Sequence, residues 1–158
     1  MATATYLVAL GSNRRSAWGS PERTVRAALD ALGGVAAASP VVRTPALGPA
    51  GRGFANAVAV VESDLLPDAM LARLKAVERA FGRRGGRRWG ARVIDLDLIG
   101  WSGGAWAEPG LVVPHREFRR RRFVLAPLAA VAPGWRDPVT GRTARQLLAQ
   151  VDRRRPRS

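Results

Sequence analysis

The chain has 158 residues, of which 47% are hydrophobic and 24% charged; this predicts a single globular domain, 1–158, and excludes a disordered chain. It contains no cysteine, which excludes disulfides, thiolate metal sites and cysteine nucleophiles. The apolar run near the N-terminus is too short to span a bilayer and lacks a preceding basic segment. We therefore expect a soluble, cytoplasmic protein with no membrane partner.

Charge is the unusual bulk property. The chain carries 26 basic and 12 acidic residues, a formal net charge of +14, and Lys75 is its only lysine. A positive field attracts nucleic acid, and it equally attracts a nucleotide triphosphate. Alternatively, the preference for arginine reflects coding bias, and most of these side chains lie on a solvated face of the protein. Net charge alone therefore leaves the function open.

The first half of the sequence contains two strand-and-helix units. Alternating or continuous apolar runs predict strands, and proline at the first helical position predicts the start of each helix. Apolar residues then recur at helical spacing until a glycine. The expected elements are a strand over 4–10, a turn at Gly11–Asn13, a helix from Pro21 to Gly33, an extended segment over 35–44, a loop over 45–53, a strand over 54–62 and a helix over 67–82.

The second half begins with a loop, 83–90, rich in arginine and glycine, a composition that no regular element favours. The patterns then predict strands over 92–99 and 111–113, a helix from Phe123, a last helix over 143–151 and a frayed tail, 153–158. The order β-α-β, β-α-β and then two helices favours an α+β sandwich. Its sheet is expected to be largely antiparallel and covered by helices.

Two carboxylates lie two residues apart on the strand over 92–99. Alternate side chains of a strand share one face, so Asp95 and Asp97 point the same way, about 6–7 Å apart along the chain. Like charges at this spacing call for a cation, and Mg²⁺ favours carboxylate and phosphate oxygens. A bare D-x-D pattern is also typical of a strand with one wet, acidic face.

Arginines surround this pair of carboxylates. Arg83, Arg84, Arg87, Arg88 and Arg92 precede it, and a magnesium-bound polyphosphate needs such positive partners. Trp89 interrupts the run, which indicates either a contact with a ligand or a tryptophan packed against the core. The chain has no G-x-x-x-x-G-K-[ST], so an ATP enzyme with this sequence does not use a P-loop.

Two further positions carry possible chemistry. His115 is the only histidine; it is either structural or a hydrogen-bond donor to phosphate. Phe54 and Asn56 share a strand face, and an aromatic ring beside an amide suits a flat heterocycle. A core phenylalanine with an edge asparagine is the plainer alternative.

Taken together, these segments resemble the hydroxymethyldihydropterin pyrophosphokinases of folate biosynthesis. They occur in the order of that family over about residues 5–135, and the stretch R-W-G-x-R-x-I-D-L-D is highly specific to it. The matching stretches are LVALGSN (7–13), RTPALG (43–48), FANAVAVVES (54–63), RWGARVIDLDLI (88–99), VPH (113–115) and RRFVLAPLAAVAP (121–133).

The resemblance implies a ferredoxin-like α+β fold and transfer of the β,γ-pyrophosphoryl unit of ATP to the pterin hydroxymethyl oxygen, with release of AMP. It implies that Asp95 and Asp97 hold two Mg²⁺ ions and that Arg83 and Arg92 act with them in catalysis. The implied pterin-binding residues are Thr44, Pro45, Leu47, Phe54, Asn56, Trp89 and Phe123. The implied ATP-binding residues are Glu78, Arg83, Arg92, Ile99 or its neighbour Leu98, Leu111, Val112, Pro114, His115 and Arg121.

Three positions depart from the family pattern. Gly85 stands where a second loop arginine is frequent, and Arg84 or Arg87 is the expected substitute. Phe54 replaces a common tyrosine, which keeps the stacking surface and loses a hydroxyl. Gly110 and Val112 replace a basic residue and a hydroxyl that often precede the VPH stretch. These changes concern individual ATP contacts and leave the implied reaction unchanged.

Two other classes of protein compete with this interpretation. A nucleic-acid-binding module would account for the arginine clusters at 83–88, 119–122 and 153–157. It leaves the paired aspartates unexplained, because carboxylates repel a phosphate backbone. A catalytically inactive pterin-binding scaffold would not need the intact pair. We therefore expect an enzyme with ATP and a pterin as partners, and neither nucleic acid nor an obligate protein partner.

Overall fold

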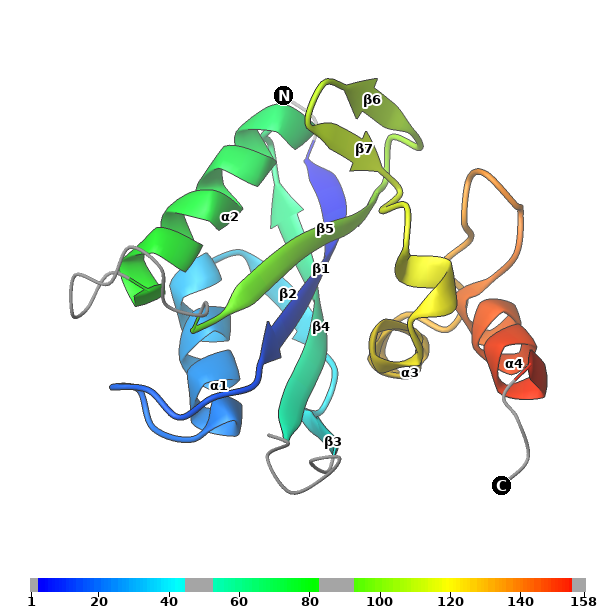
Figure 1. Ribbon diagram of the computed structural model, residues 1–158. Coiled ribbons are helices and arrows are strands. Elements are labelled where there is room, and N and C mark those ends of the chain that lie inside the picture. The colour runs from blue at the N-terminus through cyan, green and yellow to red at the C-terminus, as the bar shows by residue number, and fades with distance from the viewer. Residues whose placement is uncertain (1–2, 45–52, 83–92, 155–158) are drawn as a thin grey trace.

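The computed structural model describes residues 3–44, 53–82 and 93–154 (Figure 1). Its main sheet has the strand order β2-β4-β1-β5, with β3 also paired to β4, and every pairing in it is antiparallel. The strands are β1 (Ala4–Ser12), β2 (Val35–Ala38), β3 (Val42–Thr44), β4 (Phe54–Ser63) and β5 (Asp95–Trp101), and a separate ribbon joins β6 (Trp106–Glu108) to β7 (Leu111–Val113). The helices are α1 (Pro21–Leu32), α2 (Pro67–Gly82), the 3₁₀ turn η1 (Phe118–Arg120), α3 (Arg122–Val131) and α4 (Ala144–Arg154).

Helices cover both faces of the main sheet. Figure 1 shows α1 and α2 on one side and α3 and α4 on the other. Side chains of β1 alternate between two cores: Tyr6 and Val8 join the core under α1 and α2, and Leu7 joins the core under α3 and α4. This double burial explains why residues 4–10 form a continuous apolar run. The architecture confirms the predicted α+β fold with its largely antiparallel sheet.

The two long helices begin and end where the sequence predicts. Ser20 caps α1 by accepting a hydrogen bond from the Arg23 backbone N–H at 3.3 Å, and Pro21 occupies the first turn. Gly33 follows the helix with φ of 67°, a conformation that suits glycine. Helix α2 spans Pro67–Gly82 and buries Met70 and Leu74.

Several predicted boundaries are wrong. The segment Gly11–Asn13 is not a turn from its first residue, because β1 continues through Ser12 between two partner strands. The strand expected over 92–99 is β5, Asp95–Trp101. Strand β6 was not predicted, since its three residues are too few to show a period. Helix α4 runs to Arg154, so Arg153 and Arg154 are helical and not part of a frayed tail.

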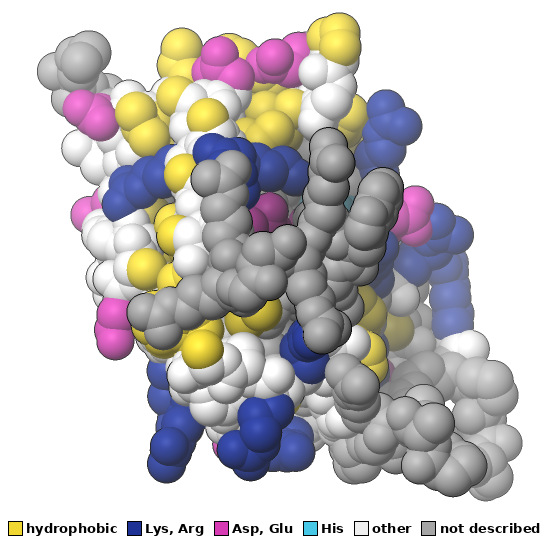
Figure 2. Space-filling model, turned by 60° about the vertical axis from the view of Figure 1, so that its left-hand side comes forward, with side chains coloured by type: hydrophobic (Ala, Val, Ile, Leu, Met, Phe, Trp, Pro, Cys, Tyr) yellow, Lys and Arg dark blue, Asp and Glu magenta, His cyan; other side chains and the backbone are white. Residues whose placement is uncertain are grey.

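Basic side chains do not gather in a single patch on the face that Figure 2 shows. On the face shown in Figure 2, the Lys and Arg side chains lie in several separate groups, with acidic side chains between them. Three arginines of the C-terminal part pair with acids, in Arg119–Asp137, Arg120–Glu117 and Arg122–Asp152. Within the described ranges, no helix is long and apolar enough to cross a membrane.

Candidate active site

The candidate site lies on the sheet face under α3, where three adjacent strands form its floor. The register places Gly11 of β1 opposite both Asn56 of β4 and Asp95 of β5. Two residues earlier on β1, Ala9 lies opposite Asp97. The side chains of β4 and β5 therefore flank a stretch of β1 in which Ala9 and Gly11 carry nothing larger than a methyl group.

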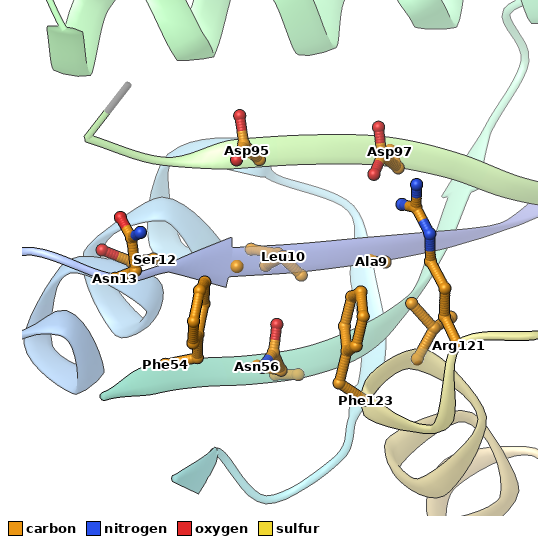
Figure 3. Close-up of a pocket in the computed structure, with 13 residues that line it drawn as sticks. Ala9, Leu10, Ser12, Asn13, Phe54, Asn56, Asp95, Asp97, Arg121 and Phe123 are labelled. Atoms are coloured by element: carbon orange, nitrogen blue, oxygen red, sulfur yellow. The ribbon is translucent and has the colours of Figure 1, made fainter. Parts of the chain in front are cut away.

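Two aromatic rings rise from this floor and form a slot. Figure 3 shows Phe54, at the start of β4, and Phe123, in the first turn of α3, on either side of Asn56. Both rings are half-exposed, at 47% and 48%, whereas Asn56 is 7% exposed. All three line a cavity of about 180 Å³ that also contains Asp95 and Asp97. A flat heterocycle stacked between the rings would present its edge to the Asn56 amide.

The carboxylate pair projects from β5 at the side of this cavity (Figure 3). Ile94, Leu96 and Leu98 are buried in the core under α1 and α2, which fixes the alternation and turns both aspartates to the opposite face. On the neighbouring strand, the Ser12 hydroxyl donates to the Val93 carbonyl at 2.8 Å and ties the beginning of β5 to β1.

The donor set of this pair suits Mg²⁺. Both ligands are hard carboxylate oxygens on one rigid strand, and Mg²⁺ is commonly bound by one or two carboxylates together with substrate phosphates. Across the described part of the chain, no group of three or more His, Asp or Glu side chains could form a closed metal site. Asp95 and Asp97 therefore fit a metal that is shared with a phosphorylated substrate.

A second cavity, of about 660 Å³, adjoins the first and shares Asp97 and Arg121 with it. Its walls come from α2, from β5, from the β6–β7 turn and from the segment that leads to η1. Its lining combines apolar side chains with three basic residues, Lys75, Arg116 and Arg121, and three acidic ones, Asp97, Glu108 and Glu117. The lining residues are Leu71, Lys75, Leu96, Asp97, Leu98, Glu108, Pro109, Gly110, Leu111, Val112, His115, Arg116, Glu117 and Arg121.

Strand β5 is an edge of the main sheet, and its backbone faces the second cavity. The Leu96 N–H donates to the Glu78 carboxylate at 2.8 Å instead of to β1. Beyond Leu98 the pairing with β1 shifts register, because Val8 lies opposite Leu98 and Leu7 opposite Gly100. Ile99 is 1% exposed, and its carbonyl accepts the His115 backbone N–H at 3.0 Å. Of these two neighbours, Leu98 is the residue that faces the second cavity.

His115 lines this cavity and is held in one orientation. Its Nδ1 accepts the Glu117 backbone N–H at 3.1 Å, so the neutral ring carries its proton on Nε2. Burial lowers the pKa of His115; nearby Asp97 and Glu117 act to raise this pKa, and Arg121 acts to lower it. The neutral imidazole is thus an Nε2–H donor beside Asp97.

The remaining predicted site residues fall into three groups. Pro45, Leu47, Arg83, Trp89 and Arg92 lie outside the described residues. Thr44 lines a third cavity together with Asn56 and Phe123. Three predicted ATP-binding residues are absent from the lining of the second cavity, namely Glu78, Ile99 and Pro114.

Sequence reasoning missed the residues at the end of β1 that line the first cavity. Ala9, Gly11, Ser12 and Asn13 all line the first cavity, although they had been assigned only to a strand and a turn. The available signal was the pair of small residues, Ala9 and Gly11, at alternate positions of an otherwise bulky strand. Lys75 was also missed, and it lines the second cavity with its ammonium 3.9 Å from Glu78.

Comparison with known proteins gives a consistent result. Residues 7–133 match the family model described as 7,8-dihydro-6-hydroxymethylpterin-pyrophosphokinase (HPPK). The chain is 40% identical over 148 residues to a 2-amino-4-hydroxy-6-hydroxymethyldihydropteridine pyrophosphokinase of Pseudomonas aeruginosa, covering 90% of this chain and 88% of the relative. A Synechocystis relative of the same name is 40% identical over 110 residues, 70% of this chain and 56% of the relative.

Solved structures agree on the fold. The HPPK-DHPS crystal structure of Plasmodium falciparum superposes with a TM-score of 0.72 at 13% identity, covering 94% of this chain and 45% of that chain. The present chain therefore spans about half the length of the Synechocystis and Plasmodium proteins and most of the Pseudomonas one.

The comparisons place the chain in one class of protein, the pyrophosphokinases, and the fold agrees with that class. Within that class, the chain belongs to the 7,8-dihydro-6-hydroxymethylpterin-pyrophosphokinase family, which is named for pyrophosphoryl transfer to the hydroxymethylpterin of folate biosynthesis.

Proposed function

We propose that this chain transfers the β,γ-pyrophosphoryl group of ATP to the hydroxymethyl oxygen of 6-hydroxymethyl-7,8-dihydropterin. A bond forms between that oxygen and the β-phosphorus, and the bond from the β-phosphorus to the α,β-bridging oxygen breaks. AMP leaves with the bridging oxygen, and the hydroxyl proton passes to solvent. The products are AMP and the pterin diphosphate in equal amounts.

One observation carries the proposal: the aromatic slot and the second cavity meet at the carboxylate pair. Asp97 and Arg121 line both cavities. If a heterocycle lies between Phe54 and Phe123 and a nucleotide occupies the second cavity, the hydroxymethyl group and the polyphosphate meet at Asp97. Holding two reactants in this way is a main source of rate enhancement in phosphoryl transfer.

Each group has a separate task in this arrangement. The two phenylalanines stack on the pterin, and Asn56 supplies a donor and an acceptor to its edge. Arg121 and the Nε2–H of His115 donate to phosphate oxygens beside Asp97. Asp95 and Asp97 would hold two Mg²⁺ ions, which when bound neutralise the charge of the phosphates. Leu98, which lines the second cavity, would contribute to the pocket for the nucleotide base.

The reaction is tested by incubating the protein with ATP, Mg²⁺ and the pterin alcohol and separating the products by chromatography. We expect AMP and pterin diphosphate in a one-to-one ratio, and no product when the pterin or Mg²⁺ is omitted. ADP formed in a pterin-dependent way would overturn the proposed reaction. Pterin binding without any turnover would favour a scaffold protein.

A further inference from the structure

Gly11 lies directly beneath the amide of Asn56. The two residues are register partners on β1 and β4, and a Cβ atom built on Gly11 would lie 2.9 Å from Asn56 Oδ1. That separation is shorter than a carbon and an oxygen atom can adopt without a shift. The next nearest atom, the Ala55 carbonyl oxygen, is at an ordinary 4.0 Å. The amide therefore occupies space that exists only because residue 11 has no side chain.

The need for glycine here is not conformational. Gly11 is not among the glycines with positive φ, and it sits inside a regular strand paired on both sides. Alanine would thus fit the backbone of β1. The single obstacle is the end of the Asn56 side chain, which can turn away. Substitution at position 11 is therefore expected to move one amide and to leave the fold intact.

The position of that amide matters because Asn56 is buried at the base of the aromatic slot. Its side chain lines the first cavity, and Figure 3 shows it directed toward β1 between Phe54 and Phe123. A 7% exposed amide that is displaced loses the alignment on which its hydrogen bonds to a ligand depend.

We propose that Gly11 is a positioning residue for the heterocyclic substrate, acting through Asn56. The absence of a Cβ at position 11 leaves the space that the amide needs in the orientation in which it faces the edge of the ring. This inference rests on the proposed function for the identity of the ligand. The placement of the amide itself is independent of that identity.

The test uses Gly11→Ala in the full chain, with Gly134→Ala as the matched control. A Cβ at Gly134 meets nothing within 4 Å, and its φ is not positive. We expect Gly11→Ala to weaken hydroxymethyldihydropterin binding by roughly ten- to a hundredfold, the loss that follows from misplacing a buried hydrogen-bonding group. Binding of a non-hydrolysable ATP analogue and the thermal midpoint should both stay at the wild-type value, as they should in Gly134→Ala.

A double-mutant cycle separates action through Asn56 from direct obstruction of the ring. If Gly11 acts through the amide, adding Gly11→Ala to Asn56→Ala should change pterin affinity less than twofold. An undiminished loss in the Asn56→Ala background would overturn the proposal, as would wild-type affinity in Gly11→Ala alone.

A ligand-free readout distinguishes failure of this inference from failure of the proposed function. The side-chain amide signals of Asn56 in a ¹⁵N–¹H spectrum should shift in Gly11→Ala and stay unchanged in Gly134→Ala. Unshifted signals in Gly11→Ala would show that Gly11 does not place the amide. Absence of pterin binding to the wild type, together with the expected shift, would overturn the proposed substrate and leave the placement standing.

Discussion

At the scale of single residues, the site depends on what each strand position presents to one face of the sheet. The D-x-D pattern was readable from sequence because alternation fixes the direction of Asp95 and Asp97 once Leu96 and Leu98 are assigned to the core. The structure has that arrangement, with both leucines in the core under α1 and α2. Gly11 was not readable in the same way, because its role depends on the register with Asn56, which the sequence does not contain.

The carboxylates provide a prediction at this scale. Asp95→Asn and Asp97→Asn keep the side-chain shape and remove one charge each, so each should lower turnover by about 100-fold or more. The thermal stability of Asp97→Asn should not fall, because the change relieves repulsion between like charges. Steady-state rates measured across a Mg²⁺ titration provide the test.

Asp64→Asn is the matched control for this pair, since Asp64 is exposed and follows the opposite end of β4 from Phe54. The control should turn over at the wild-type rate. Near-normal turnover of Asp97→Asn at ordinary Mg²⁺ would contradict the assignment of that residue to the metal.

At the scale of elements, η1 and the loop after α3 hold the aromatic slot in place. Asp137 is fully buried and receives Arg119 Nε at 2.6 Å and Nη2 at 2.9 Å. It also accepts the Thr140 hydroxyl at 2.7 Å and the Val139 N–H at 3.0 Å. Arg119 lies in η1, two residues before Arg121 and four before Phe123. This ion pair therefore anchors the segment that carries one wall of the slot.

Removing the charge of Asp137 should destabilise the whole domain. Asp137→Asn leaves the Arg119 guanidinium without its charged partner, which costs about 3–5 kcal/mol in the free energy of unfolding. The thermal midpoint should fall by roughly 6–20 °C, at about 2–4 °C per kcal/mol for a chain of this size. Asp152→Asn breaks the exposed Arg122 pair and should cost no more than about 1 kcal/mol. Equal losses in the two variants would contradict the anchoring role of Asp137.

The same pair predicts an acid dependence. Burial acts to raise the pKa of Asp137, but the hydrogen bonds from Arg119, Thr140 and Val139 outweigh burial and hold this pKa below its ordinary value of 3.8. The folded state therefore binds fewer protons at this carboxyl than the unfolded state does. Its stabilisation is fully present above pH 3.8 and is lost as the pH falls through the lowered pKa. Denaturant midpoints of wild type and Asp137→Asn should accordingly converge below pH 3.8.

The bounds of the helices and strands were predicted correctly only where the sequence carries a local signal. The long helices were placed correctly because Pro21, Pro67 and the glycines after them are local signals. The β6–β7 ribbon was only half found, since its strands have three residues each and their pairing is set by the turn between them. Helix α4 was expected to end at Val151 because the arginines after it have no apolar period, yet it continues to Arg154.

At the scale of the whole molecule, the sheet separates two cores and carries the site on one of its two faces. The fold class followed from the order of the elements, because β-α-β units with short connections allow few arrangements. The meeting of the two cavities did not follow from it, since it depends on where α3 packs against β4 and where the β6–β7 ribbon packs against β5. The net charge of +14 also remained ambiguous, because composition does not say where the charges lie.

The fate of the two transferred phosphates tests the central claim most directly. ATP labelled separately at the β- and γ-phosphates is incubated with the protein, Mg²⁺ and hydroxymethyldihydropterin, and the label is followed into nucleotide and pterin products. Attack on the β-phosphorus predicts that both labels appear in the pterin diphosphate and that the AMP is unlabelled. A β-label that stays with the nucleotide, as ADP, while the γ-label moves to the pterin would contradict pyrophosphoryl transfer at this site.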